Sequence, residues 1–204
     1  MKKLFLTSSF KDVVAIFEKF EGNLAGKTVT FIPTASVVEK VVFYVEAGKK
    51  ELVKLGLTVD ELEISTATAD EITDKLEKND FIYITGGNVF FLLQELRRTG
   101  ADKVIKEQVE VGKLYIGESA GSMIASPNIE YAQDMDSVKK APNLNTFEAL
   151  SLVDFYPIPH HTNFPFKKAV EKIISKYEAT LTLYPISNKE AISVNGDDVK
   201  VESK

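Results

Sequence analysis

The sequence predicts an α/β fold, a three-layer sandwich in which helices cover both faces of a mostly parallel sheet. Two observations support this prediction. Strand-like and helix-like segments alternate at a regular pitch up to about Ala125, as in repeated βαβ units. One strand-like segment, Phe81-Ile82-Tyr83-Ile84, is apolar throughout, as expected for a strand covered on both faces. With 204 residues and no recognisable linker, the chain is expected to form one domain, 1–204.

The first half of the chain contains strand-like runs separated by helical periodicity. In 10–20 and 36–55, apolar residues recur every three or four positions, which is the spacing of one helix face, and a glycine follows each segment. The strands expected in this half are 3–7, 29–32, 81–84 and one that starts at 57 and ends by 64. The remaining helices expected here are 70–78, 89–98 and 101–111.

The second half is less regular. A short apolar strand is expected at 114–116, whereas 126–150 is rich in Pro, Asn and Asp and predicts loops with short strands. A strand at 155–158 and a helix at 166–177 follow. The tail predicts strands at 181–183, 191–194 and 199–201, with Asn195-Gly196-Asp197-Asp198 as the turn between the last two.

Composition excludes several classes of function. The 25 basic and 30 acidic residues give a net charge of −5, and no basic cluster suggests a nucleic-acid partner. No apolar run is long enough for a membrane span, and the first residues resemble a strand rather than a signal peptide, so we expect a cytoplasmic protein without a membrane partner. Cysteine is absent, which excludes disulfides, thiolate zinc sites and a cysteine nucleophile.

A candidate nucleophile lies in Gly117-Glu118-Ser119-Ala120-Gly121, which matches the G-x-S-x-G pattern. A short apolar strand precedes Ser119 and a helical segment follows it, which is the context of a nucleophile elbow. Glycines allow the tight turn that exposes the serine oxygen. The pattern therefore favours a catalytic serine over an ordinary loop serine.

Serine needs a general base, and the only two histidines are neighbours. His160 is the first choice and His161 the second, because both follow a strand, at the edge where α/β sheets place their ligands. An acid should orient the imidazole. The spacing leaves the acid open among the candidates Asp134, Asp136, Asp154 and Glu171.

A second glycine turn offers an oxyanion hole. Thr85-Gly86-Gly87-Asn88 follows the buried strand and opens a helix, so its amides, together with that of Ala120, could hold a tetrahedral oxyanion. A phosphate site is the rival use of such a turn, but neither G-x-G-x-x-G nor the P-loop lysine pattern is present. We therefore expect no cofactor and no metal.

Three ordered segments together resemble the dipeptidase E family of serine peptidases (alpha-aspartyl dipeptidases), which is related to cyanophycinase. They are Ile84-Thr85-Gly86-Gly87-Asn88-Val89-Phe90, Leu114-Tyr115-Ile116-Gly117-Glu118-Ser119-Ala120-Gly121 and Pro159-His160-His161-Thr162-Asn163. The resemblance covers nearly the whole chain. It implies the class I glutamine-amidotransferase-like (flavodoxin-like) fold and hydrolysis of short peptides.

The resemblance also implies roles for individual residues. Ser119 would be the nucleophile, His160 its base, and the amides of Gly87 and Ala120 the oxyanion hole. Gln133-Asp134-Met135 matches the family's Asn-Asp-Met stretch, so Asp134 becomes the first choice for the acid, with Glu171 as the alternative. The residues expected to bind substrate are Asn88, Glu118, Glu130 and His161.

Two residues depart from the family pattern. Glu118 replaces an aromatic residue and Glu130 replaces an arginine. A pocket for an N-terminal aspartyl residue should present positive charge, so these acids argue against aspartyl specificity. The expected protein is thus a serine peptidase for short peptides, a monomer or a homodimer. An α/β-type esterase and a non-catalytic binding protein on the same fold are the alternatives.

Overall fold

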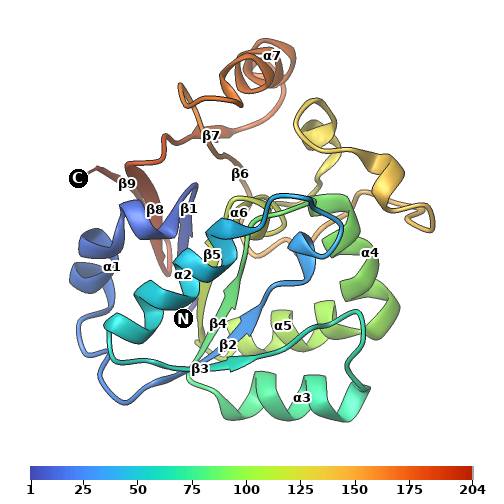
Figure 1. The fold of residues 1–204 in the computed structure, drawn as a ribbon. Helices are drawn as coiled ribbons and strands as arrows, with labels where there is room; N and C mark the ends of the chain where they lie inside the picture. Colours follow the sequence, from blue (N-terminus) through green and yellow to red (C-terminus); the bar gives the residue numbers. More distant parts are fainter. Residues whose placement is uncertain (204) are drawn as a thin grey trace.

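The computed structural model describes residues 1–203. Within them, a seven-stranded sheet has the order β3-β2-β4-β5-β1-β8-β9 (Figure 1). The strands are β1 Lys3–Thr7, β2 Thr28–Ile32, β3 Thr58–Glu61, β4 Phe81–Ile84, β5 Leu114–Glu118, β8 Glu190–Asn195 and β9 Asp198–Ser203. The first five of these run parallel, and β8 and β9 add an antiparallel hairpin beside β1. The predicted α/β fold with a mostly parallel sheet is confirmed.

Helices cover both faces of this sheet (Figure 1). On one face, α1 (Val14–Glu21) and α2 (Phe43–Lys54) bury an aromatic-rich cluster that includes Phe17, Phe31 and Tyr83. The larger cluster lies on the other face, under α3 (Ala69–Lys78), α4 (Val89–Thr99) and α5 (Ala101–Glu110). Successive residues of β4 point to opposite clusters, which explains why that strand is apolar throughout.

The helices predicted at 10–20 and 36–55 begin later than their apolar spacing suggests. Their first residues are held instead by hydrogen bonds to residues distant in the sequence. The Phe10 amide donates a hydrogen bond to Glu118 Oε1 at 2.9 Å, and 10–12 is a separate 3₁₀ turn before α1. The Ala35 carbonyl accepts the Asn88 amide at 2.8 Å, and Thr34–Ser36 is a 3₁₀ turn. Consequently α2 starts only at Phe43. Two residues of the segment before it, Glu39 and Val41, line a cavity.

The remaining segments lie beyond the carboxyl ends of the parallel strands (Figure 1). They contain the four-residue helix α6 (Ala120–Met123), α7 (Lys167–Tyr177), and the parallel pair β6 (Tyr156–Ile158) and β7 (Leu183–Pro185). The segment 126–150 consists mainly of loops and 3₁₀ turns, with an isolated bridge from Asn128 to Glu148. Among residues 1–203, none of the helices has the length and apolarity that a membrane crossing requires.

Candidate active site

Ser119 lies in a sharp turn between β5 and α6. Its φ of 50° and ψ of −105° are rare for a residue with a side chain. The turn packs against its surroundings so closely that a Cβ on Gly117 would lie 2.4 Å from the Gly121 carbonyl oxygen. A Cβ on Gly121 would lie 2.2 Å from the Ile84 carbonyl oxygen. The two glycines of the G-x-S-x-G pattern are therefore required by backbone packing.

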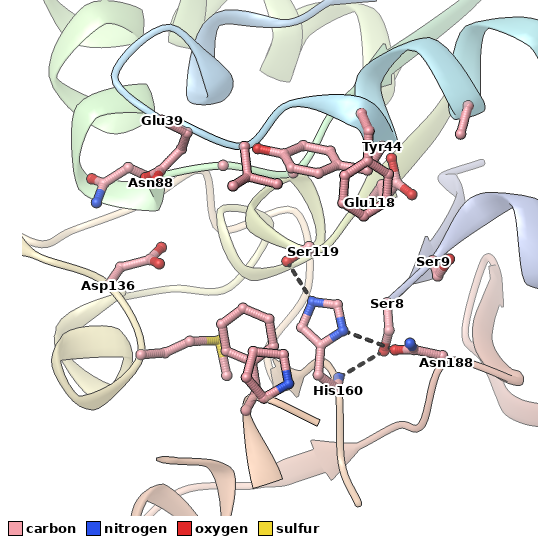
Figure 2. Close-up of a pocket in the computed structure, with 18 of the residues that line it drawn as sticks. Ser8, Ser9, Glu39, Tyr44, Asn88, Glu118, Ser119, Asp136, His160 and Asn188 are labelled. Atoms are coloured by element: carbon pink, nitrogen blue, oxygen red, sulfur yellow. Dashed lines mark hydrogen bonds between the residues drawn. The ribbon is translucent and has the colours of Figure 1, made fainter. Parts of the chain in front are cut away.

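The His160 side chain faces this serine. Ser119 Oγ lies 3.0 Å from His160 Nε2, which is hydrogen-bond distance (Figure 2). The Ser8 hydroxyl accepts the backbone amide of His160 at 2.9 Å, and the ring of Phe166 stacks on the imidazole at a centroid distance of 4.6 Å. Burial holds the pKa of His160 below its ordinary value, although the hydrogen bond to Asn188 opposes this shift. The lowered pKa favours the neutral imidazole, which is the form that a general base requires.

Asn188 occupies the position where an acid was expected. Its Oδ1 lies 2.8 Å from His160 Nδ1 (Figure 2). The Asn188 amide donates to Asn163 Oδ1 at 2.9 Å, and the Asn163 amide donates to the His160 carbonyl at 2.9 Å. Because an amide oxygen can only accept, Nδ1 carries the proton and Nε2 is left to accept from the serine hydroxyl. An uncharged side chain thus holds the imidazole of His160.

The two carboxylates expected to orient His160 lie elsewhere. Asp134 Oδ1 is 2.6 Å from Lys172 Nζ, on α7. Glu171 is an exposed residue of α7 whose carboxylate is 3.9 Å from Lys167 Nζ. Neither makes a hydrogen bond with the imidazole, and the side chain that contacts His160 Nδ1 is Asn188 rather than either predicted acid. No sequence pattern marks Asn188, because the residue beside the imidazole was expected to be a carboxylate.

Asp134 should not be needed for peptide hydrolysis. The Asp134→Asn variant removes one partner of a surface ion pair, and such pairs contribute about 0–1 kcal/mol to stability. We expect kcat/KM for peptide hydrolysis to stay within about twofold of the wild-type value, since the residue does not contact His160. Steady-state kinetics on a hydrolysed dipeptide measures this. A loss of two orders of magnitude would restore Asp134 as the acid.

The two amides predicted to form an oxyanion hole lie beside Ser119. Gly87 has a φ of 136°, and a Cβ there would lie 2.1 Å from the Ala35 carbonyl oxygen, so the turn needs glycine. The adjacent Gly86 passes beside Ser119, because a Cβ on it would come within 3.2 Å of the serine Cβ. Within residues 1–203, the amides of Gly87 and Ala120 donate to no protein acceptor. Both donors are therefore available to a ligand.

Ser119 and His160 open into a cavity of about 630 Å³. Its lining includes Asn88 and Glu118, two of the residues expected to bind substrate. The other two do not line it: Glu130 is an exposed residue of a 3₁₀ turn, and the His161 amide donates to the Ile186 carbonyl. The charged residues of the lining are Lys11, Asp12, Glu39, Glu118, Asp136 and Lys140. Acidic residues thus outnumber basic ones in the lining of this cavity.

Comparison with known proteins identifies the family. Residues 4–202 match the model of peptidase family S51. The chain belongs to this family. An uncharacterized peptidase of Listeria monocytogenes is 65% identical over 199 residues, covering 98% of this chain and 97% of that protein. A Salmonella arizonae peptidase E is 36% identical over 137 residues, covering 67% of this chain and 56% of that protein.

A solved structure extends the comparison to the fold. The crystal structure of a Listeria monocytogenes protein provisionally described as a peptidase E superposes with a TM-score of 0.97 at 63% identity, covering 100% of this chain and 99% of that one. The resemblance to dipeptidase E and the glutamine-amidotransferase-like fold are thereby confirmed. The S51 chain is a peptidase.

The buried carboxyl group of Glu118, next to Ser119 in this S51 peptidase, is held by two donors. Glu118 is 4% exposed; its Oε1 accepts the Phe10 amide at 2.9 Å and its Oε2 accepts the Tyr83 hydroxyl at 2.8 Å. Burial raises the pKa of Glu118 to about 7, although both hydrogen bonds lower it. Since both oxygens are occupied, Glu118 is anchored in the wall of the cavity.

Proposed function

We propose that this S51 peptidase hydrolyses short peptides, with Ser119 as nucleophile, His160 as general base and Asn188 as the residue that orients the base. The observation that carries the proposal is the 3.0 Å contact from Ser119 Oγ to His160 Nε2 inside a cavity at the carboxyl ends of the strands. A cavity of about 630 Å³ suits a small peptide better than a folded protein.

The mechanism follows from the positions of these groups. His160 Nε2 takes the proton of Ser119 as the serine oxygen bonds to the peptide carbonyl carbon, and the amides of Gly87 and Ala120 stabilise the resulting oxyanion. The intermediate collapses when the carbon–nitrogen bond breaks, and His160 gives its proton to the leaving amine. Water, deprotonated by His160, then attacks the acyl-enzyme, which releases the acid and restores Ser119.

A fluorophosphonate probe tests the proposal together with a dipeptide panel. An activated serine reacts with the probe, so we expect covalent labelling at Ser119, located by mass spectrometry, and hydrolysis of at least one dipeptide. Ester turnover without peptide turnover would favour the esterase alternative. No labelling and no turnover, with the protein folded, would favour the non-catalytic binding protein.

The role of Asn188 predicts a shift in the pH dependence. His160 must be neutral to act, so kcat/KM falls as the pH decreases through the His160 pKa. In Asn188→Asp, which keeps the side-chain length, a carboxylate beside Nδ1 raises that pKa by about 1–3 units. The acidic limb of the kcat/KM profile should move to higher pH by the same amount. The matched Asn163→Asp variant should move it less, because within residues 1–203 the hydrogen bonds of Asn163 join backbone atoms and none reaches the imidazole.

Removing the acceptor gives the complementary test. Asn188→Ala leaves the Nδ1 proton without a partner, so the ring can adopt the wrong tautomer, and we expect kcat to fall about 10²-fold. If Asn188→Asp left the acidic limb unmoved and Asn188→Ala kept wild-type kcat, Asn188 would have no role in positioning His160.

A further inference from the structure

The cavity has a carboxylate-lined side that the proposed mechanism does not use. Asp136, Glu39 and Asn88 lie on one side of Ser119, whereas Asn188 and Ser8 lie on the other (Figure 2). A substrate whose carbonyl carbon reaches Ser119 must place its flanking groups in these two directions. The chemistry of the Asp136 side therefore affects which substrates fit.

The carboxylates on that side differ in whether a cation neutralises them. Lys140 Nζ lies 2.6 Å from Glu39 Oε1, so Glu39 is paired. Asp136 Oδ2 accepts the Val89 amide at 2.9 Å. Among residues 1–203, no donor contacts its second oxygen, and Asp136 borders the cavity. Asp136 thus faces the substrate space with one oxygen that has no partner in the described part of the chain. Burial raises its pKa to about 7, although the Val89 amide and Lys140 lower it, so the group carries its full negative charge above neutral pH.

Several acidic groups lie close together around Tyr44 on the Asp136 side of the cavity. Tyr44 lies close enough to Glu39, Glu118 and Asp136 that their charges, after burial, keep the pKa of its phenol well above the usual value. Lys11 lies over the ring of Phe43, its Nζ 5.9 Å from the centroid, and Lys140 is paired with Glu39. Lys140 lowers the pKa of Asp136 in part, but its ammonium group is ion-paired with Glu39, and among residues 1–203 no ammonium group forms an ion pair with Asp136.

Arginine cannot supply the missing positive charge. The chain has only two arginines, Arg97 and Arg98, both on α4. Arg98 pairs with Glu95 at 2.7 Å, and Arg97 donates to the Glu148 carbonyl at 2.7 Å. Neither lines the cavity. A substrate carboxylate would thus find no guanidinium here. Above the raised pKa of Asp136, about 7, it would also meet a like charge, which is unfavourable.

We infer that this peptidase selects substrates that bring an ammonium group to Asp136 and rejects peptides with an acidic N-terminal residue. This inference rests on the proposed function, because the cavity must be the substrate site. The ammonium could be the α-amino group of the peptide or the side chain of an N-terminal lysine. In either case it would donate to the free oxygen of Asp136 and offset its charge.

The test uses Ala-Ala, Lys-Ala and Asp-Ala, each with a free and an acetylated amino terminus. For the wild-type enzyme we expect kcat/KM for the free Ala and Lys peptides to exceed that for Asp-Ala by about 10²-fold. Loss of turnover on acetylation of both favoured peptides would assign the ammonium to the α-amino group. Retained turnover of acetyl-Lys-Ala would assign it to the lysine side chain.

The decisive variant is Asp136→Asn, because asparagine retains the acceptor for the Val89 amide and removes only the charge. We expect KM for the favoured peptides to rise about 10- to 100-fold and discrimination against Asp-Ala to shrink. Glu130→Gln, which neutralises an exposed acid that does not line the cavity, should change neither. Melting temperature and fluorophosphonate labelling at Ser119 show that the variant is folded with an intact nucleophile.

A binding measurement separates this inference from the proposed function. Calorimetry of the three free peptides on Ser119→Ala, with and without Asp136→Asn, reports affinity without turnover. Weaker Lys-Ala or Ala-Ala binding in the double variant supports the role of Asp136. Unchanged affinity and KM in Asp136→Asn, or wild-type preference for Asp-Ala, would overturn it. Full hydrolysis by Ser119→Ala would instead refute the proposed nucleophile.

Discussion

Ser119→Ala is expected to lower kcat/KM for peptide hydrolysis by about 10⁴- to 10⁶-fold, because it removes the atom that bonds to the substrate carbon. His160→Ala should cost a similar amount, since the hydroxyl 3.0 Å from Nε2 is a weak nucleophile without its base. The two residues act as a unit, so the double variant should be scarcely slower than either single variant. Single-turnover and steady-state kinetics on the same dipeptide measure all three.

Ser151→Ala is the matched control for this prediction. Ser151 is also a serine with positive φ, 51° against 50° for Ser119, but it is exposed and lies outside the cavity. It should retain wild-type kcat/KM, which shows that the backbone conformation alone does not account for the loss. Residual activity in Ser119→Ala above about 1% of wild type, with contamination excluded, would contradict the assignment.

Gly121→Ala is expected to have the largest effect on stability. The added Cβ would lie 2.2 Å from the Ile84 carbonyl oxygen and 2.9 Å from its carbon, and both belong to the backbone of a central strand. The clash can be relieved only if β4 or the turn that carries Ser119 moves. We expect the free energy of unfolding to fall by about 3 kcal/mol, at the upper end for an overpacked site. Urea denaturation followed by circular dichroism measures it.

Gly26→Ala controls for the loss of glycine itself. Gly26 has a φ of 77°, but no atom lies within 4 Å of the position its Cβ would take. Only backbone strain is added there, so the expected loss is about 1–2 kcal/mol. If both variants lost the same free energy of unfolding, the contact with Ile84 would not be the reason that position 121 requires glycine. In Gly121→Ala we also expect kcat per folded molecule to fall, because Ser119 must move with the turn.

Local sequence pattern predicted most of the main sheet because its strands are short apolar runs bounded by turns and its helices have one apolar face. The local pattern mispredicted helix starts where hydrogen bonds to distant residues determine the backbone conformation. The amide of Phe10 is captured by Glu118, 108 positions away, and this contact separates the first turn from α1. Residues 36–42 have helical spacing but turn toward the cavity, because the preceding turn is tied to Asn88.

Some residues of the candidate site lie in recognisable sequence motifs, and others do not. The nucleophile, the base and the glycine turn each carry a short motif, and the structure brings Ser119 and His160 together. The orienting residue has no motif: Asn188 lies 28 positions after His160, beyond α7 and β7, and reaches the imidazole only because both loops end at the same edge of the fold. Asp136 was one of four interchangeable acids in the sequence. Only the cavity distinguishes it from the ion-paired Asp134.

The contacts of the histidine loop make the two facing side chains depend on different parts of the chain. The Ile186 carbonyl accepts both the Ser8 hydroxyl and the His161 amide, and Asn188 Oδ1 lies 2.8 Å from His160 Nδ1. The position of Ser119 is set instead by the turn after β5. A substitution that loosens residues 186–188 should therefore displace the imidazole and leave the serine turn in place.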